Sequence, residues 1–507
     1  MSTVPRVRRN DWSSIPVPAL GDWRPSLPVS VVIPAYQCQA SLDLTLASLA
    51  RQTYPAELLE VVVVDDNSRP PLELPKLRPE RTRLVRPAEG WGRANALATG
   101  ASHSDGELIH WLDADMVVYP EHVEAQARWH HAVPYAVTLG SKRFVDVHPD
   151  HPRWPTPDEV ADGADRLFAG LPSAPHDYVE RQIAATDQLR AADHLGFMVH
   201  VGATAALRRE LYDATGGLDP SLRLGEDTEF GYRLAQAGAV FVPEPAARSW
   251  HLGASHMMRH EQALQRYNRP HLAELMPQPR WLRRVGGTGW RVPLATVVMH
   301  VDGEPLERVR AAVDAVLRGT ESDLRVLLVG PWDSLTEERT SPLADPLLDL
   351  RLIAVTYRSD PRVRLVTRAP DSAYPSPFLL TVPVTDQVLG RSAVRRLLDY
   401  ADRHQLGLVR VELAPGATVE LWRTAALGRA GWVRRAGEPL AEVVAEVAGA
   451  GTLSADELGA GRWLPASVEV AGFRSLVTAA GLVARLAARQ ARRRLRRRDP
   501  AAKHSAI

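Results

Sequence analysis

The chain has 507 residues, more than one ordinary hydrophobic core holds, so we expect two domains. Lys and Arg (61) nearly balance Asp and Glu (60), and the net charge of +1 argues against a nucleic-acid-binding protein. The single cysteine, Cys38, excludes an intrachain disulfide. The sequence lacks an apolar run of membrane-spanning length and an apolar signal-peptide core, so we expect a cytoplasmic protein.

Residues 1–28 are polar and interrupted by prolines, and we expect this N-terminal leader to lie over the surface. The apolar runs 29–33 and 61–64 predict buried strands, and leucines at helical spacing predict a helix over 41–50 between them. Strand, helix and strand in succession form a βαβ unit, which predicts a parallel sheet in an α/β domain.

Polar side chains follow the predicted strands where each strand ends. They are Pro34, Ala35 and Tyr36 after the first strand, Asp65 and Asp66 after the second, and Asp113 and Asp115 after a strand over 108–112. Ligands of such sheets bind beyond the carboxyl ends of the strands, so we expect these residues at one edge. The two carboxylates of the D-A-D segment suit Mg²⁺ or Mn²⁺ with a substrate phosphate, although the same pattern occurs in solvated turns.

Two further segments carry candidate site residues. Residues 90–100 read as a glycine turn that leads into a helix, and Arg93 near its start either meets a phosphate or is an ordinary exposed arginine. A helix over 224–237 has Glu226 and Asp227 near its start, where the helix dipole alone would favour carboxylates.

The remaining segments of this half are less regular. Residues 146–180 are rich in Pro, Asp and His without the spacing of a zinc site, and we expect an irregular loop near an acceptor. A strand and turn over 197–207 and a short strand over 240–242 follow, and the segment 249–253, with His251, ends the core.

Residues 29–255 resemble the family-2 glycosyltransferases of the GT-A fold. The resemblance rests on SVVIPAY, VVVVDDNS, GRANALATG, the D-A-D segment, GGLDPSLRLGEDTEFGYRLAQAG and the trailing His251, in that order. It covers a little under half of the chain. It implies a mixed, mostly parallel sheet and the transfer of a sugar from a nucleoside diphosphate, usually UDP, with inversion of configuration.

The resemblance also implies a role for each matching residue. Pro34, Ala35 and Tyr36 would border the nucleotide, and Asp65 or Asp66 would bond its base. Asp113 and Asp115 would hold ribose and metal, and His251 falls where related enzymes have a further metal or phosphate ligand. Asp227, paired with Glu226, would be the catalytic base. The chemistry requires these types, since a cation stabilises the leaving diphosphate and a carboxylate accepts the acceptor's proton.

Two departures from the family pattern limit the expected activity. Ala98 stands where synthase-like members often have Asn, and residues 262–269 lack the QxxRW signature of processive polysaccharide synthases. The expected acceptor is a glycan or lipid-linked precursor in polysaccharide biosynthesis of the cell envelope. The alternatives are a non-catalytic nucleotide-sugar or glycan-binding scaffold and a nucleotidyltransferase, and the Glu226–Asp227 pair favours sugar transfer over both.

The first domain is expected to span 29–279, with a linker over 280–292 and a second, non-catalytic α/β domain over 293–460. Segments 295–300, 306–317 and 325–329 repeat the strand–helix–strand order of residues 29–64, with Gly-Pro-Trp-Asp at 330–333 in place of Asp65-Asp66-Asn67-Ser68. Two alternatives remain open: a degenerate GT-A-like repeat without metal and base residues, and an unrelated α/β domain.

Residues 461–507 form a basic C-terminal tail. From Phe473 to Arg498 an apolar run precedes a cluster of arginines, a pattern typical of an amphipathic helix on an anionic membrane surface. This pattern predicts peripheral contact with the inner face of a membrane, and the alternative is a soluble tail.

Overall fold

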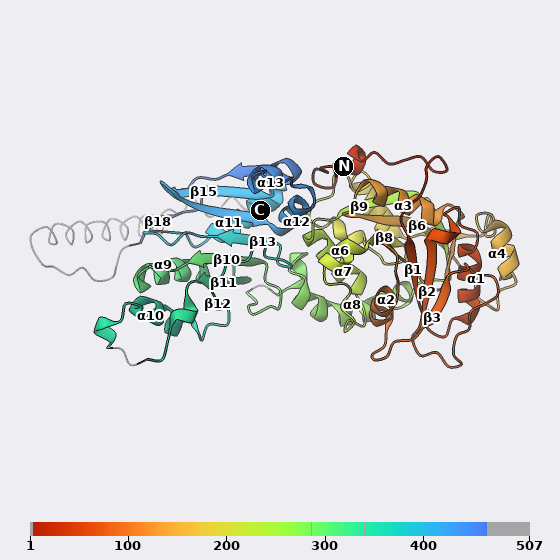
Figure 1. Cartoon of the computed structure of the whole chain (residues 1–507), viewed down its shortest axis with the longest axis horizontal. Helices are drawn as coiled ribbons and strands as arrows, with labels where there is room; N and C mark the ends of the chain where they lie inside the picture. Colours follow the sequence, from red (N-terminus) through yellow and green to blue (C-terminus); the bar gives the residue numbers. More distant parts are fainter. Residues whose placement is uncertain (1–3, 285, 339–340, 464–507) are drawn as a thin grey trace, which may run out of the picture.

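The computed structural model describes residues 4–284, 286–338 and 341–463, which form two α/β units joined side by side. The first unit occupies the right half of Figure 1 and the second unit the left half. The basic segment 473–498 lies outside the described residues. Within the described part, no helix combines the length and apolar character needed to cross a membrane.

The first unit is built on a mixed sheet with the strand order β3-β2-β1-β4-β8-β6-β9-β5, and β7 pairs with β6. Strands β3, β2, β1 and β4 are mutually parallel, β8 is antiparallel to both of its neighbours, and β6 is parallel to β9. The strands are β1 (Val29–Ala35), β2 (Leu59–Asp65), β3 (Thr82–Val85), β4 (Leu108–Trp111), β5 (Met116–Val118), β6 (Ala136–Val145), β7 (Ser173–Pro175), β8 (Ala205–Arg208) and β9 (Val240–Leu252). The predicted α/β fold with its parallel βαβ start is confirmed.

Helices cover both faces of this sheet, because β1 and β2 carry apolar side chains toward both. The helices of the unit are α1 (Gln39–Leu49), α2 (Arg93–Ser102), α3 (His122–Ala132), α4 (Pro157–Gly163), α5 (Asp177–Ala185), α6 (Arg209–Ala214), α7 (Glu226–Gln236) and α8 (His256–Leu275). Leu42 and Leu46 of α1 pack with Val31 on one face. On the other face α2 lies so close that a Cβ at Gly100 would be 2.3 Å from Val32 Cγ1.

Three local predictions were wrong. The segment 197–207 does not begin with a strand: Gly196–Val199 form a 3-10 helix, and β8 starts at Ala205. Residues 146–180 are not an irregular loop: α4 begins with a capping box between Thr156 and Glu159, and β7 and the start of α5 follow. The predicted strand 240–242 is the beginning of the thirteen-residue β9, which extends through the SWHLG segment. Pro243 and Pro245 obscured it, since prolines break a strand pattern. Pro243 pairs in register with Leu139, whereas Pro245 lies in a bulge of β9, residues 245–247, opposite the step from Gly140 to Ser141 of β6.

The second unit contains a seven-stranded sheet in the order β12-β11-β10-β13-β16-β15-β17 and a two-stranded sheet of β14 and β18. The strands are β10 (Ala295–His300), β11 (Leu324–Val329), β12 (Val363–Val366), β13 (Phe378–Thr381), β14 (Gln387–Val388), β15 (Leu408–Ala414), β16 (Ala417–Arg423), β17 (Ala450–Thr452) and β18 (Gly461–Arg462). The helices are α9 (Leu306–Leu317), α10 (Leu348–Tyr357), α11 (Ala393–His404), α12 (Thr424–Val433) and α13 (Leu440–Ala448).

The two large sheets share one topology. From β12 to β17, as from β3 to β9, three parallel pairings are followed by two antiparallel pairings and one parallel pairing, with corresponding strands in the same chain order. This likeness favours the repeat over an unrelated domain. The second unit has no helix between β12 and β13, where the first has α2 with Arg93. The domain boundaries and a non-catalytic role remain predictions.

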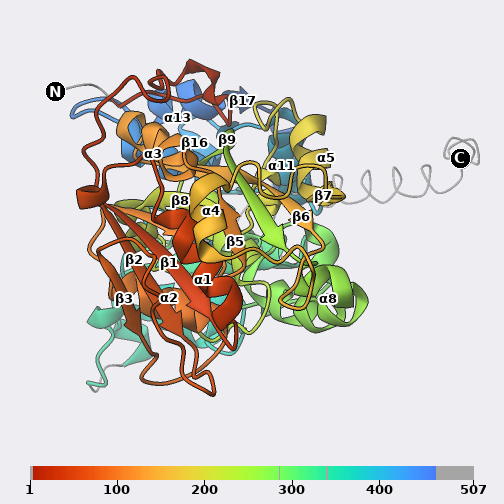
Figure 2. The same cartoon turned by 90° about the vertical axis from the view of Figure 1, so that its right-hand side faces the viewer.

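The leader ties the two units together and does more than lie over the surface. Arg6 forms ion pairs with Glu438 and with Glu446 of α13, while the Asn10 side chain bonds both backbone groups of Phe241 in β9 at 2.9 Å. Val7 is fully buried. Figure 2 shows the leader running beside α13 and above α3.

Candidate active site

The carboxyl ends of β1, β2 and β4 meet at one edge of the first sheet, as predicted. Pro34 and Ala35 are the last two residues of β1, and Ala35 pairs with Asp65 of β2. The Ala35 carbonyl accepts a hydrogen bond from the backbone N–H of Asp66 at 2.9 Å. Tyr36 follows β1 and is 58% exposed. These residues form an open edge beside the acids described below.

Asp65 and Asp66 have different environments. Asp65 is fully buried, and its carboxylate accepts hydrogen bonds from the backbone of Ser68 and Leu72 and from Arg86. Its hydrogen-bonding capacity is thus used within the protein. Asp66 accepts one bond, from the Gly92 N–H at 2.7 Å, and its Oδ1 has no partner among the described residues. The geometry therefore favours Asp66 over Asp65 as the group that meets a ligand.

Asp113, Asp115 and His251 form a metal-capable cluster. Their ligand atoms all lie within 4.8 Å of one another. Strand β5 begins one residue after Asp115 and pairs with β9, so that Met116 is opposite His251 and the His251 Nε2 lies 3.7 Å from Asp115 Oδ1. The predicted three residues are thus brought together by strands far apart in the sequence.

The donor set of this cluster fits a divalent cation. His251 Nδ1 lies 3.1 Å from the Gly253 carbonyl, which can only accept, so Nδ1 carries the proton and Nε2 retains its lone pair. Asp115 Oδ1 is buried without a hydrogen-bond partner among the described residues. Burial raises the pKa of Asp115; His251 opposes this effect and Asp113 adds to it. A cation bound here would satisfy Asp115 and offset its burial.

Arg93 joins this cluster to the start of α7. Its Nη2 lies 2.9 Å from Asp113 Oδ1, and its Nη1 lies 2.8 Å from both Glu226 Oε1 and Asp227 Oδ1. Both helices begin at the site, α2 with Arg93 and α7 with Glu226, so their N-terminal dipoles also favour negative charge here. Arg93 is therefore not an ordinary exposed arginine.

The environment separates the pKa values of Glu226 and Asp227. Burial raises the pKa of Glu226, and the charge of Asp227 raises it further. Burial also acts to raise the pKa of Asp227. The positive charge of Arg93, the interaction with His200 and a backbone hydrogen bond from Gly202 act in the opposite direction and outweigh burial, so the pKa of Asp227 is lowered. Asp227 thus loses its proton at lower pH than Glu226 and is the better candidate of the pair for an ionised base.

The sequence reasoning missed three residues at the site. His200 holds the Asp227 backbone, with Nδ1 2.7 Å from the carbonyl oxygen. A Cβ at Gly202 would lie 2.4 Å from Asp227 Oδ1, so only glycine allows this approach. Lys142 is buried and donates to the Ala203 carbonyl at 2.5 Å. A lysine inside the apolar strand β6 was an available signal, whereas His200 and Gly202 act through contacts that no spacing reveals.

The charges of the site do not balance. Four carboxylates (Asp113, Asp115, Glu226 and Asp227) face two cations, Arg93 and Lys142, so the cluster formally carries two negative charges in excess. The charges of Asp113 and Asp227 act to raise the pKa of Lys142, although burial, the largest influence, lowers it. A divalent cation would neutralise this excess.

Comparison with known proteins gives a family for this part of the chain. Residues 30–216 match the family described as glycosyl transferase family 2. A validoxylamine A glucosyltransferase of Streptomyces hygroscopicus subsp. limoneus is 29% identical over 51% of this chain and 58% of its own length. A probable N-acetylgalactosaminyltransferase 7 of Caenorhabditis elegans is 28% identical over 46% of this chain and 41% of its own length. The match thus spans 58% of the length of the first relative and 41% of the second.

Two solved structures are also similar. A mannosyltransferase of Pyrobaculum calidifontis in complex with GDP-Man and Mn²⁺ aligns over 53% of this chain and 67% of its own, with 20% identity and a TM-score of 0.31. GalNAc-T7 with UDP, GalNAc and Mn²⁺ aligns over 45% and 44%, with 18% identity and the same TM-score of 0.31. At these identities and this TM-score, the two structures do not indicate which nucleotide sugar this chain uses. The sequence match alone identifies the family: residues 30–216 of this chain belong to glycosyl transferase family 2.

Proposed function

We propose that the chain is a divalent-metal-dependent, inverting glycosyltransferase that uses a nucleoside-diphosphate sugar, with UDP as the nucleotide. The observation that carries this proposal is the contact of one arginine, Arg93, with both the metal-capable cluster and the Glu226–Asp227 pair. A cation-binding group and an ionised carboxylate are the two components that sugar transfer needs, and here they adjoin.

The donor would bind at the edge formed by β1, β2 and β4. Asp66, with its unpartnered Oδ1, would accept a hydrogen bond from the base, and Tyr36 would border it. Asp113, Asp115 and His251 would hold Mn²⁺ or Mg²⁺, and the bound cation would supply positive charge to the leaving diphosphate. Arg93 would add a second positive charge on the same side.

Asp227 would act as the general base. The acceptor hydroxyl needs a carboxylate that is ionised at neutral pH, and the lowered pKa of Asp227 fulfils that condition. His200 and Gly202 fix the position of Asp227, which limits the directions from which a hydroxyl can approach. Direct attack on the anomeric carbon needs no covalent intermediate and inverts its configuration. The acceptor we propose is a glycan or a lipid-linked glycan precursor.

The decisive experiment is a thermal-shift and hydrolysis screen of nucleotide sugars with Mn²⁺. One nucleotide sugar should raise the melting temperature and be hydrolysed slowly, and EDTA should remove both effects. Asp115→Ala should abolish them. Asp371→Ala, which removes a carboxylate that is 95% exposed on the second unit, should retain them.

Three other outcomes would contradict the proposal. Stabilisation by a nucleotide sugar without any hydrolysis or transfer, with every acceptor class tried, would indicate a binding scaffold. Release of pyrophosphate from a nucleoside triphosphate and a sugar phosphate would indicate a nucleotidyltransferase. Undiminished activity in EDTA would exclude the metal from the mechanism.

A further inference from the structure

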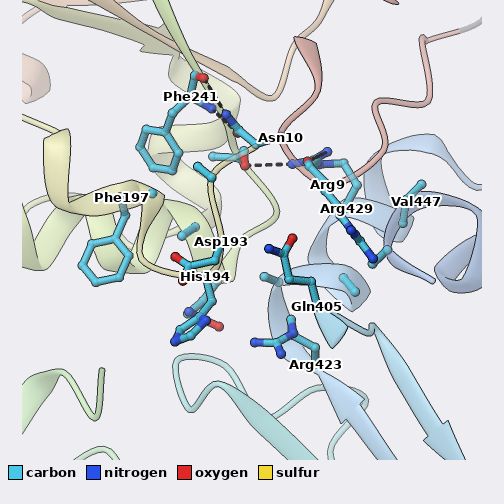
Figure 3. A pocket seen from close by; sticks show the side chains of 18 residues that line it. Arg9, Asn10, Asp193, His194, Phe197, Phe241, Gln405, Arg423, Arg429 and Val447 are labelled. Atoms are coloured by element: carbon cyan, nitrogen blue, oxygen red, sulfur yellow. Dashed lines mark hydrogen bonds between the residues drawn. The ribbon is translucent and has the colours of Figure 1, made fainter. Parts of the chain in front are cut away.

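A cavity of about 120 Å³ lies between the two units, and none of its lining residues belongs to the metal-capable cluster. Its walls are the loop around His194 and the last turn of α7 in the first unit, the leader, and the start of α12 in the second unit (Figure 3). Cavities that hold drug-sized ligands measure about 300–1,000 Å³, so a nucleotide sugar does not fit. A cavity of about 150 Å³ holds benzene, so a phosphate or a small carboxylic acid does fit.

Three arginines line this cavity: Arg9 of the leader, and Arg423 and Arg429 at the start of and within α12. Arg423 forms an ion pair with Asp402 at 2.8 Å, whereas Arg9 and Arg429 form none among the described residues. Arg9 donates to the His404 carbonyl at 3.0 Å, and Arg429 donates to backbone carbonyls that include Val7 at 2.9 Å. Carbonyl oxygens satisfy these donors without neutralising their charge, so the cavity wall carries uncompensated positive charge.

The pKa directions agree with this charge excess. Burial lowers the pKa of Arg429 to about 10. Burial, together with the charges of Arg8 and Arg423, lowers the pKa of Arg9. The carboxylate among the described lining residues is Asp193, which is exposed and already accepts a bond from the Leu195 backbone at 2.8 Å. A bound anion would stabilise the charged form of both arginines and so raise their pKa values again.

The N-terminus of α12 opens into the same cavity. Ala425 and Ala426 of its first turn line the wall, and the N-cap residue Arg423 provides no side-chain acceptor for the free N–H groups. The Thr424 N–H is occupied, because it donates to the Pro377 carbonyl at 2.8 Å. Unpaired N–H groups and the helix dipole add to the attraction for an anion that the arginines produce.

A buried amide supplies an independent sign of a missing partner. Gln236, in the last turn of α7, lines the cavity and is only 4% exposed, yet its Oε1 has no hydrogen-bond partner among the described residues. His194 Nδ1, from another wall segment, also has no hydrogen-bond partner among the described residues and lies 3.9 Å from Asp402 Oδ1. Figure 3 shows His194, Gln405 and Arg423 arranged around one space. Because Gln236 Oε1 only accepts, a ligand that carries a hydrogen-bond donor, such as the O–H of a hydrogen phosphate, beside its negative oxygens would satisfy this amide, which otherwise costs free energy.

We propose that this cavity binds a small oxyanion, the phosphate or carboxylate group of a low-molecular-weight ligand, at a site separate from the donor site. The guanidinium groups and the N–H groups of α12 would hold the negative oxygens, and the amide of Gln236 would bond a neighbouring polar group of the ligand. Since both units contribute walls, an occupant would also strengthen their contact.

The test is titration calorimetry of the full chain in EDTA, with inorganic phosphate in one arm and malonate in the other, at ionic strength held constant with chloride. Wild-type protein should bind at least one of the two anions at a single site. Ala425→Asp should weaken that binding at least about tenfold, because it places a carboxylate in the first turn of α12. The nearly isosteric, neutral Ala425→Asn is the matched control and should change the affinity less than about threefold.

Two further variants complete the design. Arg9→Gln should weaken binding severalfold. Because Arg9 is exposed, this substitution should leave the core intact. Asp115→Ala, which would disable the proposed metal site, should bind the anion like wild type, so a failure of the proposed function would not be mistaken for a failure here. An acidic residue in a first helical turn is favourable, so Ala425→Asp should fold, as circular dichroism would verify.

Each result decides the matter. A difference between phosphate and malonate would identify which chemistry the site prefers. Equal affinity of Ala425→Asp and wild type would overturn the proposal. So would the failure of wild type to bind either anion at tens-of-millimolar concentration.

Discussion

Arg93 Nη1 lies 2.8 Å from Asp227 Oδ1, and this pair links the first residue of α2 to the first turn of α7. The same guanidinium contacts Asp113, a member of the metal-capable cluster, at 2.9 Å. The proposed base and the proposed metal site therefore share one cation. A change at either one alters the electrostatic environment of the other.

Replacement of Arg93 should raise the pKa of Asp227. Arg93 is the strongest of the influences that lower this pKa. Without Arg93, the effect of burial, which raises the pKa, would no longer be offset to the same extent. In Arg93→Gln the acid limb of the pH profile of kcat/KM should move to higher pH, since the base becomes protonated earlier. Arg93→Lys retains the charge and should move it less. An acid limb that stays in place in Arg93→Gln would show that Asp227 does not set it.

Removal of Asp115 should weaken metal binding directly. Asp115→Asn should reduce Mn²⁺ affinity by at least about tenfold, measured by electron paramagnetic resonance without nucleotide. Asp66→Asn, at the same sheet edge but outside the cluster, is the control and should retain the wild-type affinity. If the two variants bind Mn²⁺ equally well, the cluster of Asp113, Asp115 and His251 is not the metal site.

Asp227→Asn should separate catalysis from binding. The amide keeps the shape of the carboxylate but cannot accept the proton, so we expect turnover to fall by roughly a hundredfold or more. Donor affinity, measured by calorimetry with Mn²⁺, should remain nearly unchanged. Loss of donor affinity with surviving turnover would make Asp227 a binding residue and require a different base.

The sequence predicts those helices and strands whose signals lie within a single segment, such as an apolar run or apolar residues at helical spacing. The β-branched runs of β1 and β2 and the spacing of α9 are readable without the structure, and the predicted α9 bounds agree with it. Asp113, Asp115 and Asp227 are also predictable, because a strand end or a helix start places each of them. His251 follows from family resemblance and needs the pairing of β5 with β9 to reach Asp115.

The remaining features depend on contacts between distant segments. Arg6 and Asn10 look like residues of a polar leader until their partners in α13 and β9 are known. Prolines hide most of β9. The repeated strand–helix–strand order of residues 295–329 suggested that the second unit repeats the first, but without the metal and base residues the sequence left an unrelated domain open until the sheet orders could be compared. The cavity between the units is formed by segments that lie far apart in the sequence, and none of them carries a recognisable binding pattern.

Buried histidines should make the stability of the chain sensitive to mild acid. Burial lowers the pKa of His122 to about 4 and that of His130 to about 3. The folded chain therefore keeps both neutral, whereas the unfolded chain takes up protons below about pH 6.5. Stability contributed by the two residues is present above that pH and is lost as the pH falls toward their folded pKa values.

The two residues together should lower the free energy of unfolding by about 2 kcal/mol between pH 6.5 and 5.5, as urea denaturation would measure. His122→Gln should reduce this pH dependence, and the exposed His103→Gln should leave it unchanged. An equal slope in all three proteins would show that His122 does not remain neutral in the folded chain.

The contact between the units should depend on Gly428 of α12. A Cβ at Gly428 would lie 2.6 Å from the backbone carbon of Ala237, and one at Gly238 would lie 2.2 Å from the backbone nitrogen of Arg429. Two backbones thus meet without side chains between them. The contact also positions the end of α7, whose first turn carries the proposed base.

Gly431 provides a control in the same helix, since a Cβ there would meet nothing within 4 Å. Gly431→Ala should stabilise the chain by up to about 1 kcal/mol, because alanine favours helix over glycine. Gly428→Ala has the same helical preference but must push the units apart, so we expect a net loss of about 2 kcal/mol in urea denaturation. If both substitutions stabilise the chain equally, the backbones of α12 and the turn after α7 are not in close contact.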